Sequence, residues 1–153
     1  FNLYALIEEV MGLLEIRAQE KNIELLFDKP ISLDELWVLA DRKRISQVIT
    51  NLIVNSLKYG VSGGTTEVSI SVLNKQKILV RIIDNGRGIE EEHMPLLFER
   101  FYRVDKARNR DEGGSGLGLA IVKHLIEAHQ EKIYVQSTFG VGSEFSFSLS
   151  KTK

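Results

Sequence analysis

The chain has 153 residues, of which 43% are hydrophobic and 27% are charged. This length and balance suit a domain with a hydrophobic core, and they exclude a disordered tail or a miniature scaffold. Twenty Lys and Arg against 21 Asp and Glu leave a formal net charge of −1, so no overall field favours nucleic acid or an anionic membrane. We therefore expect one domain over residues 1–153, with no nucleic-acid partner and no direct membrane contact.

The first half of the chain alternates helical and extended patterns. Apolar residues at helical spacing over Leu3–Ala18 predict a helix, and the apolar run Ile23–Phe27 predicts a strand. Leu36–Ala40 predicts a short apolar strand, after which Asp41 is placed to cap a second helix. That helix carries its apolar residues on one side, and we expect it to end near Tyr59–Gly60.

The second half begins with strands. Thr66–Val72 alternates apolar and polar residues, which predicts a half-buried strand, whereas Ile78–Ile83 is almost continuously apolar and predicts a central strand. Glu91–Phe98 follows as a short helix, which Pro95 starts or interrupts. Residues 103–114 are highly charged and contain almost no apolar anchor, so we expect a mobile loop there.

The end of the chain predicts a helix and a hairpin. Apolar residues at helical spacing over Leu117–Ile126 are followed by two strand patterns, Lys132–Ser137 and Ser143–Leu149. Because helices and strands are interspersed and the last two strands are adjacent, we expect an α/β fold, a two-layer sandwich with a mixed sheet. The chain has no Cys, and no apolar run approaches the roughly 20 residues that span a bilayer. Phe1 leads straight into a helical pattern without a signal peptide or an initiator Met, so we expect a domain cut from a longer protein.

Three polar side chains share one face of the second predicted helix. Asn51, Asn55 and Lys58 lie at offsets of four and three residues, which places them on one stripe. An Asn oxygen suits Mg²⁺, which takes its remaining ligands from water and substrate phosphates, and an ammonium offsets phosphate charge. The alternative is that the stripe is simply the solvated side of a helix whose other side is apolar.

A carboxylate follows the predicted central strand. Asp84 stands beside Gly86 and Gly88, and glycine lets backbone approach a flat ligand closely. An ionised Asp accepts hydrogen bonds and the adenine N6 amine donates them, so Asp84 is a candidate adenine contact. The alternatives are an Asx turn or a hairpin at Asn85-Gly86, although the helical pattern that follows weakens the hairpin interpretation.

A glycine-rich run over residues 113–119 leads directly into the last predicted helix. Unpaired N–H groups and the dipole at a helix start favour a polyphosphate. The run lacks the third glycine of the dinucleotide fingerprint and the Gly-Lys-Ser/Thr ending of the P-loop, so both of those nucleotide folds are disfavoured.

Four segments in order resemble motifs of the ATP-binding domain of two-component sensor histidine kinases. They are residues 51–59, similar to the N box; 84–88, similar to the first glycine box; 98–103, similar to the F box; and 114–119, similar to the second glycine box. Residues 140–145 are similar to the third glycine segment, so the resemblance covers nearly the whole chain. It implies the Bergerat (GHKL) fold, with about five mixed strands backed by three helices and ATP held under a mobile lid at about residues 103–114.

The resemblance also implies roles for individual residues. Asn55 is expected to bind Mg²⁺, Tyr59 to stack on the nucleotide and Asp84 to anchor adenine. The expected phosphate contacts, which we also take as catalytic, are Asn51, Lys58 and Arg103. The residues expected to shape the nucleotide cleft are Gly86, Gly88, Gly114, Ser115, Gly116, Leu117 and Gly118.

The function implied is that of a protein-histidine kinase. The domain is expected to bind ATP with Mg²⁺ and to pass the γ-phosphoryl group to a histidine on a separate dimerisation and phosphoacceptor domain. The parent protein would be a homodimer that passes the phosphoryl group on to a response regulator. We expect this domain to be the cytoplasmic part of a membrane-anchored sensor.

Two alternatives remain open. A serine or threonine kinase of the anti-sigma type has a similar size, but Asn51 opposes it. The resemblance implies that the other branches of the superfamily have a Glu at this position, which can act as a general base, whereas an amide cannot. The complete set of site residues opposes a second alternative, an interaction module that has lost its activity.

The three histidines and one turn depart from the expected pattern. His93, His124 and His129 do not lie in the sequence context of a phosphoacceptor histidine, so we expect them to have structural or surface roles. Gln130 and Glu131 replace a common Gly-Gly pair, which leaves the local turn open.

Overall fold

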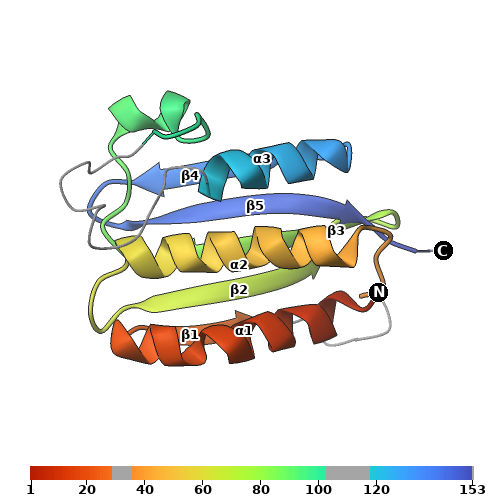
Figure 1. Ribbon diagram of the computed structural model, residues 1–153, viewed down its shortest axis with the longest axis horizontal. Helices are drawn as coiled ribbons and strands as arrows, with labels where there is room; N and C mark the ends of the chain where they lie inside the picture. Colours follow the sequence, from red (N-terminus) through yellow and green to blue (C-terminus); the bar gives the residue numbers. More distant parts are fainter. Residues whose placement is uncertain (29–35, 103–117, 153) are drawn as a thin grey trace.

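The computed structural model describes residues 1–28, 36–102 and 118–152. Within these residues, three α-helices cover one face of a five-stranded sheet, so the expected two-layer α/β sandwich is confirmed (Figure 1). The helices are α1 (Leu3–Glu20), α2 (Arg42–Tyr59) and α3 (Gly118–Ala128), and a 3₁₀-helix, η1, spans Glu91–Leu96. The strands are β1 (Glu24–Asp28), β2 (Thr65–Val72), β3 (Lys77–Asp84), β4 (Ile133–Thr138) and β5 (Gly142–Ser150).

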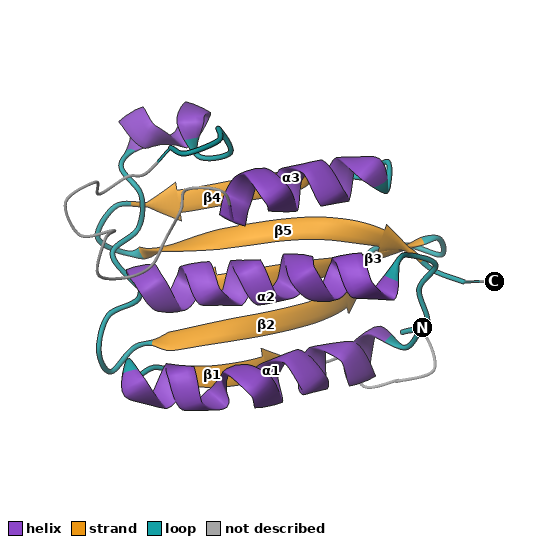
Figure 2. Cartoon of the chain, viewed as in Figure 1, coloured by secondary structure: helices purple, strands orange, loops and turns teal. Residues whose placement is uncertain are grey.

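The sheet is mixed, in the order β1-β2-β3-β5-β4 (Figure 2). β1 runs parallel to β2, and every other pair of neighbours is antiparallel. β3 is the central strand, as its apolar run predicts, and its side chains alternate between fully buried and partly exposed. The last two strands form the expected hairpin. The sheet therefore buries one face under the helices and leaves the other partly open to solvent.

The helix starts follow from local capping. The Asp41 carboxylate accepts a hydrogen bond from the Arg44 N–H at 3.2 Å, which confirms the predicted cap of α2. The Asn2 side chain caps α1 in the same way through Ala5 N–H at 3.1 Å. The fully buried apolar faces of α1 and α2 pack against the inner face of the sheet. No helix among the described residues has both the length and the apolar character needed to cross a membrane.

Two predicted elements differ in the structure. Leu36–Ala40 forms only isolated bridges, from Trp37 to Asn2 and from Val38 to Lys151. Each bridge pairs a single residue, so no ladder forms and the segment is not a strand. The expected helix over Glu91–Phe98 is a 3₁₀-helix that stops at Leu96. Pro95 lies inside it and lacks the N–H that an α-helical turn requires. The loop expected at residues 103–114 lies outside the described residues.

His129 joins α3 to α2. Its Nδ1 lies 2.8 Å from the Leu125 carbonyl oxygen, which only accepts, so Nδ1 carries the proton. Its Nε2 accepts the Asp41 N–H at 3.1 Å. One neutral imidazole therefore ties the C-terminal end of α3 to the first residue before α2. This placement agrees with the structural role expected for His129.

The turn after His129 closes without glycine. Gln130 adopts a left-handed φ of 61°, a conformation that usually favours glycine. The next residue, Glu131, accepts hydrogen bonds from Lys77 and from the Ser148 hydroxyl. The Lys77–Glu131 ion pair is largely buried on the Glu131 side, with 8% of that side chain exposed. Tertiary contacts of Glu131 thus fix a turn that glycines commonly form.

The bridge made by His129 predicts different costs for two substitutions of similar length. His129→Gln extends an oxygen to the position of Nε2 and should keep the Asp41 contact, whereas His129→Met offers no strong acceptor there and should lose it; both lose the Leu125 contact. We expect Met to reduce the free energy of unfolding by about 1 kcal/mol more than Gln. Urea unfolding of both variants measures this difference. Equal stabilities, or a more stable Met variant, would contradict the bridge.

Gly88 and Gly63 form a matched pair for a second prediction. Both have left-handed backbones, with φ of 73° and 84°, but a Cβ on Gly88 would lie 2.2 Å from the Thr138 carbonyl oxygen, whereas a Cβ on Gly63 would meet nothing within 4 Å. Gly63→Ala should cost about 1–2 kcal/mol of stability from backbone strain alone. Gly88→Ala should cost at least about twice as much, because the backbone of the β4–β5 hairpin must also shift. Thermal unfolding of the two variants tests this order.

Candidate nucleotide site

The predicted site residues that the structure describes lie toward one end of the sheet. There the C-terminal end of α2, the end of β3 and the first residue of α3 lie together, at the left of Figure 1. Ser56 Oγ on α2 lies 2.9 Å from Thr66 Oγ1 on β2, and Thr66 pairs with Asp84 across the sheet. Asp84 therefore lies beneath the same turn of α2 that carries Asn55 and Tyr59.

The polar stripe on α2 borders the core. Asn51, Asn55 and Lys58 are all partly exposed, next to buried apolar residues of the same helix. Asn51 Nδ2 donates to the Gly118 carbonyl oxygen at 3.5 Å, so the stripe touches the first residue of α3. The Asn55 carboxamide has no hydrogen-bond partner among the described residues. The Lys58 ammonium lies 5.4 Å from the centre of the Tyr59 ring.

Asp84 is the buried carboxylate of this region, with 8% of the residue exposed. Burial raises the pKa of Asp84 above its ordinary value, and backbone hydrogen bonds from Gly86 and Ser143 act in the opposite direction. Asp84 Oδ1 accepts the Gly86 N–H at 3.0 Å, so the Asx turn expected as an alternative is present. The alternative of a hairpin at Asn85-Gly86 is wrong, because η1 follows β3.

The glycines beside Asp84 make close contacts with the protein's own backbone. A Cβ on Gly86 would lie 2.5 Å from the Tyr59 carbonyl oxygen, and one on Gly142 would lie 2.1 Å from the Asp84 carbonyl oxygen. Sequence reasoning assigned glycine at Gly86 and Gly88 to the approach of a flat ligand. In the structure the absent side chains let the loop after β3 pack between α2 and the β4–β5 hairpin.

Arg87 is a residue of this loop that the sequence analysis did not single out. Its guanidinium carbon lies 5.2 Å from the centre of the Tyr59 ring, and its N–H donates to the Tyr59 carbonyl at 3.2 Å. The Arg87 carbonyl accepts the Gly140 N–H at 2.6 Å. The only signal in the sequence is a cation between two glycines, which identifies no partner.

Several predicted positions lie outside the described residues. They are Arg103, Gly114, Ser115, Gly116 and Leu117. Gly118 is described, and a Cβ there would meet nothing within 4 Å. The phosphate contacts expected from the glycine-rich run are therefore represented in the structure by Gly118 alone.

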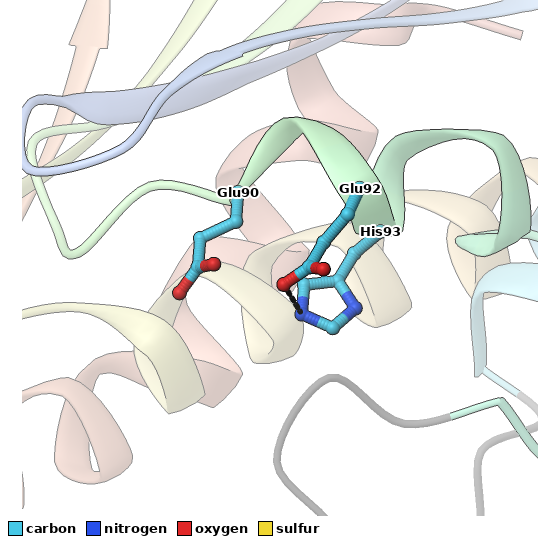
Figure 3. A group of neighbouring side chains, drawn as sticks. All are labelled: Glu90, Glu92 and His93. Carbon is cyan, nitrogen blue, oxygen red and sulfur yellow. Dashed lines mark ion pairs between the residues drawn. The ribbon is translucent and has the colours of Figure 1, made fainter.

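The structure also brings together Glu90, Glu92 and His93, whose ligand atoms lie within 4.8 Å of one another (Figure 3). His93 Nδ1 is hydrogen-bonded to the Tyr102 hydroxyl, and its Nε2 lies 3.7 Å from a Glu92 carboxylate oxygen. Both ring nitrogens thus face partners within the protein, and both carboxylates are exposed. The cluster ties η1 to Tyr102, which agrees with the structural role expected for His93.

Comparison with known proteins adds to this geometry. Residues 40–153 match the family described as histidine kinase-, DNA gyrase B-, and HSP90-like ATPase. The chain is 40% identical over 132 residues to the sensor histidine kinase WalK of Bacillus subtilis, an alignment that covers 86% of this chain and 21% of WalK. The chain thus spans about a fifth of that relative.

Solved structures agree with the sequence relatives. The nucleotide-free catalytic domain of the histidine kinase ThkA has a TM-score of 0.84 at 32% identity, covering 99% of this chain and 94% of that one. ThkA in complex with the response regulator TrrA matches at a TM-score of 0.80 and 31% identity, over 99% and 41%. Full-length ShkA in complex with AMPPNP matches at 0.83 and 28%, over 99% and 31%. The chain therefore belongs to the histidine kinase-, DNA gyrase B- and HSP90-like ATPase family, and its fold is that of a histidine kinase catalytic domain.

Proposed function

We propose that this chain binds ATP with Mg²⁺ and donates the γ-phosphoryl group to a histidine on a separate dimerisation and phosphoacceptor domain. The observation that carries the proposal is the buried Asp84 carboxylate beneath the turn of α2 that bears Asn55 and Tyr59. A buried acceptor next to a partly exposed aromatic ring suits a flat base with an exocyclic amine. The AMPPNP complex of ShkA supports the choice of an adenine nucleotide.

The residues of the site divide the work. Asp84 would accept from the adenine amine, and Tyr59 would pack on the base. Asn55 would supply an oxygen to Mg²⁺, which needs few protein ligands when phosphates and water complete its shell. Asn51 and Lys58 would contact the phosphates. Arg103 and the glycine-rich residues 114–117 remain predictions from the family resemblance.

The chemistry asked of the protein is chiefly positioning and charge neutralisation. Phosphoryl transfer passes through a loose transition state, so holding the donor in line with the acceptor supplies much of the catalysis. Neutral imidazole is already nucleophilic, whereas a hydroxyl or a water molecule needs a base. The stripe on α2 offers two amides and an ammonium, and none of these accepts a proton near neutral pH. This favours a histidine acceptor over serine or water.

The proposed reaction requires an acceptor histidine and a downstream partner. Because it spans about a fifth of WalK, the acceptor histidine would lie on another part of the parent protein. We propose a homodimeric, membrane-anchored sensor whose cytoplasmic part contains this domain over residues 1–153, with a lid at about 103–114. The ThkA–TrrA complex supports a response regulator as the downstream partner.

The raised pKa of Asp84 predicts opposite pH dependences for stability and for binding. Between the unfolded pKa, about 3.9, and the higher folded pKa, the folded chain holds more protons than the unfolded chain. The free energy of unfolding of the nucleotide-free chain should therefore fall as pH rises through this window. Adenosine affinity should rise over the same window, because the ionised carboxylate is purely an acceptor.

Urea unfolding and adenosine calorimetry from about pH 4 to pH 7 measure both slopes. Adenosine is used because it has no phosphate to titrate. The control is Asp84→Asn, which has no proton to exchange there and presents a donor to the adenine amine. It should bind adenosine about tenfold more weakly and lose both contributions. Identical pH slopes in the wild type and the Asn variant would contradict the assignment.

Asn55 and Gln47 provide a second test, which concerns the Mg²⁺ ligand. Both carboxamides lie partly exposed on α2, with Gln47 two turns nearer the N-terminal end. Asn55→Ala should reduce the Mg²⁺-dependent part of ATP affinity about tenfold or more and spare adenosine binding. Gln47→Ala should change neither.

With radiolabelled Mg·ATP, the isolated chain should release little phosphate. When the dimerisation helices of the parent protein are added, label should appear on them as acid-labile phosphohistidine. Acid-stable label would point to a serine or threonine kinase, and vigorous phosphate release by the chain alone would move it to the hydrolysing branch of its family.

A further inference from the structure

Arg87 contacts two parts of the site, the end of α2 and the tip of the β4–β5 hairpin. Its backbone N–H and its guanidinium both contact Tyr59, at 3.2 Å to the carbonyl oxygen and 5.2 Å to the ring centre. Its carbonyl accepts the Gly140 N–H at the tip of the β4–β5 hairpin, at 2.6 Å. Arg87 also lies three residues after Asp84, in the loop whose Gly86 N–H donates to the Asp84 carboxylate.

We infer that Arg87 is a positioning residue for the nucleotide base, acting through the ring of Tyr59. The inference rests on the proposed function, since it concerns how the adenine site is held. Tyr59 is the last residue of α2, and Gly60 follows it in extended backbone. A guanidinium 5.2 Å from the centre of the ring limits how the ring can turn and attracts its face.

Close packing of the neighbouring residue fixes the backbone of Arg87. Gly86, next to it, packs so closely on the Tyr59 carbonyl and on Gly60 that a Cβ would approach them to 2.5 Å and 2.8 Å. The guanidinium therefore extends from a fixed base rather than from a free loop. The guanidinium and the Tyr59 ring are then in contact before any nucleotide arrives. Such preorganisation raises affinity by reducing the ordering that binding requires.

Lys58 also lies near the Tyr59 ring, at 5.4 Å, but it is a different kind of neighbour. Its ammonium sits on a flexible four-carbon stem and suits a point contact with phosphate. Arg87 and Lys58 therefore divide two tasks, with the guanidinium holding the ring and the ammonium meeting the phosphates. The competing assignment is that Arg87 itself binds the polyphosphate.

Calorimetry with adenosine, ADP and ATP separates these assignments. Arg87→Met keeps the apolar stem and removes the guanidinium, and we expect a loss of affinity of about three- to tenfold that is the same for all three ligands. Arg87→Lys should recover little, because an ammonium does not stack as a plane. Arg44→Met, at the other end of α2, is the matched control and should change nothing. A loss that grows with phosphate number would overturn the inference, as would a gain in affinity.

A double-mutant cycle excludes a general structural effect. In the Tyr59→Leu background, Arg87→Met should cause no further loss of adenosine affinity, because the ring it positions is gone. The same fold-loss in both backgrounds would overturn the inference.

Aromatic NMR of the nucleotide-free chain tests the contact itself. The chain has four Tyr residues, and the Tyr59 signals are those missing from Tyr59→Leu. Arg87→Met should shift the Tyr59 ring signals in the absence of nucleotide. If the Tyr59 signals do not shift in Arg87→Met although the wild type binds adenosine, the inference about Arg87 is overturned and the proposed function is not. A wild-type chain that binds no adenine nucleotide instead overturns the proposed function.

Discussion

One buried carboxylate at the end of the central strand constrains the backbone that surrounds it. Removing a charge from water is unfavourable, and for Asp84 that loss outweighs the hydrogen bonds from Gly86 and Ser143, so its pKa stays raised. Ionised Asp84 is thus less favourable in the folded chain than in water. Perturbed carboxyl groups of this kind are often found where a ligand completes the hydrogen bonding of a site.

The glycines around this carboxylate follow from the same constraint. To supply backbone N–H groups to Asp84, the loop after β3 and the start of β5 must approach each other and α2 closely. Gly86 and Gly142 leave no room for a Cβ, since one would lie within 2.5 Å and 2.1 Å of a carbonyl oxygen. Glycine is needed here because protein backbone occupies the space, which is a different reason from the close approach of a ligand that sequence reasoning proposed.

What could be predicted from the sequence was local. The cap by Asp41 and the extended character of the segments that form β1 to β5 depend on neighbours within a few residues, and the structure confirms them. Leu36–Ala40 was predicted wrongly because a strand exists only if its partners form a ladder, and here two different segments each pair with a single residue. The contacts of Arg87 and His129 were missed for a related reason. They join elements far apart in the chain, such as Asp41 and His129, 88 residues away, and no spacing rule encodes them.

α2 connects these contacts into one unit. At its N-terminal end, His129 fixes the helix to the end of α3, and at its C-terminal end Tyr59 is held by the loop that bears Asp84 and Arg87. Between these two ends, the Asn51 side chain donates a hydrogen bond to the carbonyl of Gly118, the first residue of α3. The polar stripe of α2 is therefore connected to α3 as well. A helix fixed in this way holds its polar groups at set positions while offering no base of its own along the stripe. That combination suits a domain that presents an activated phosphoryl group and leaves the nucleophile to another part of the protein.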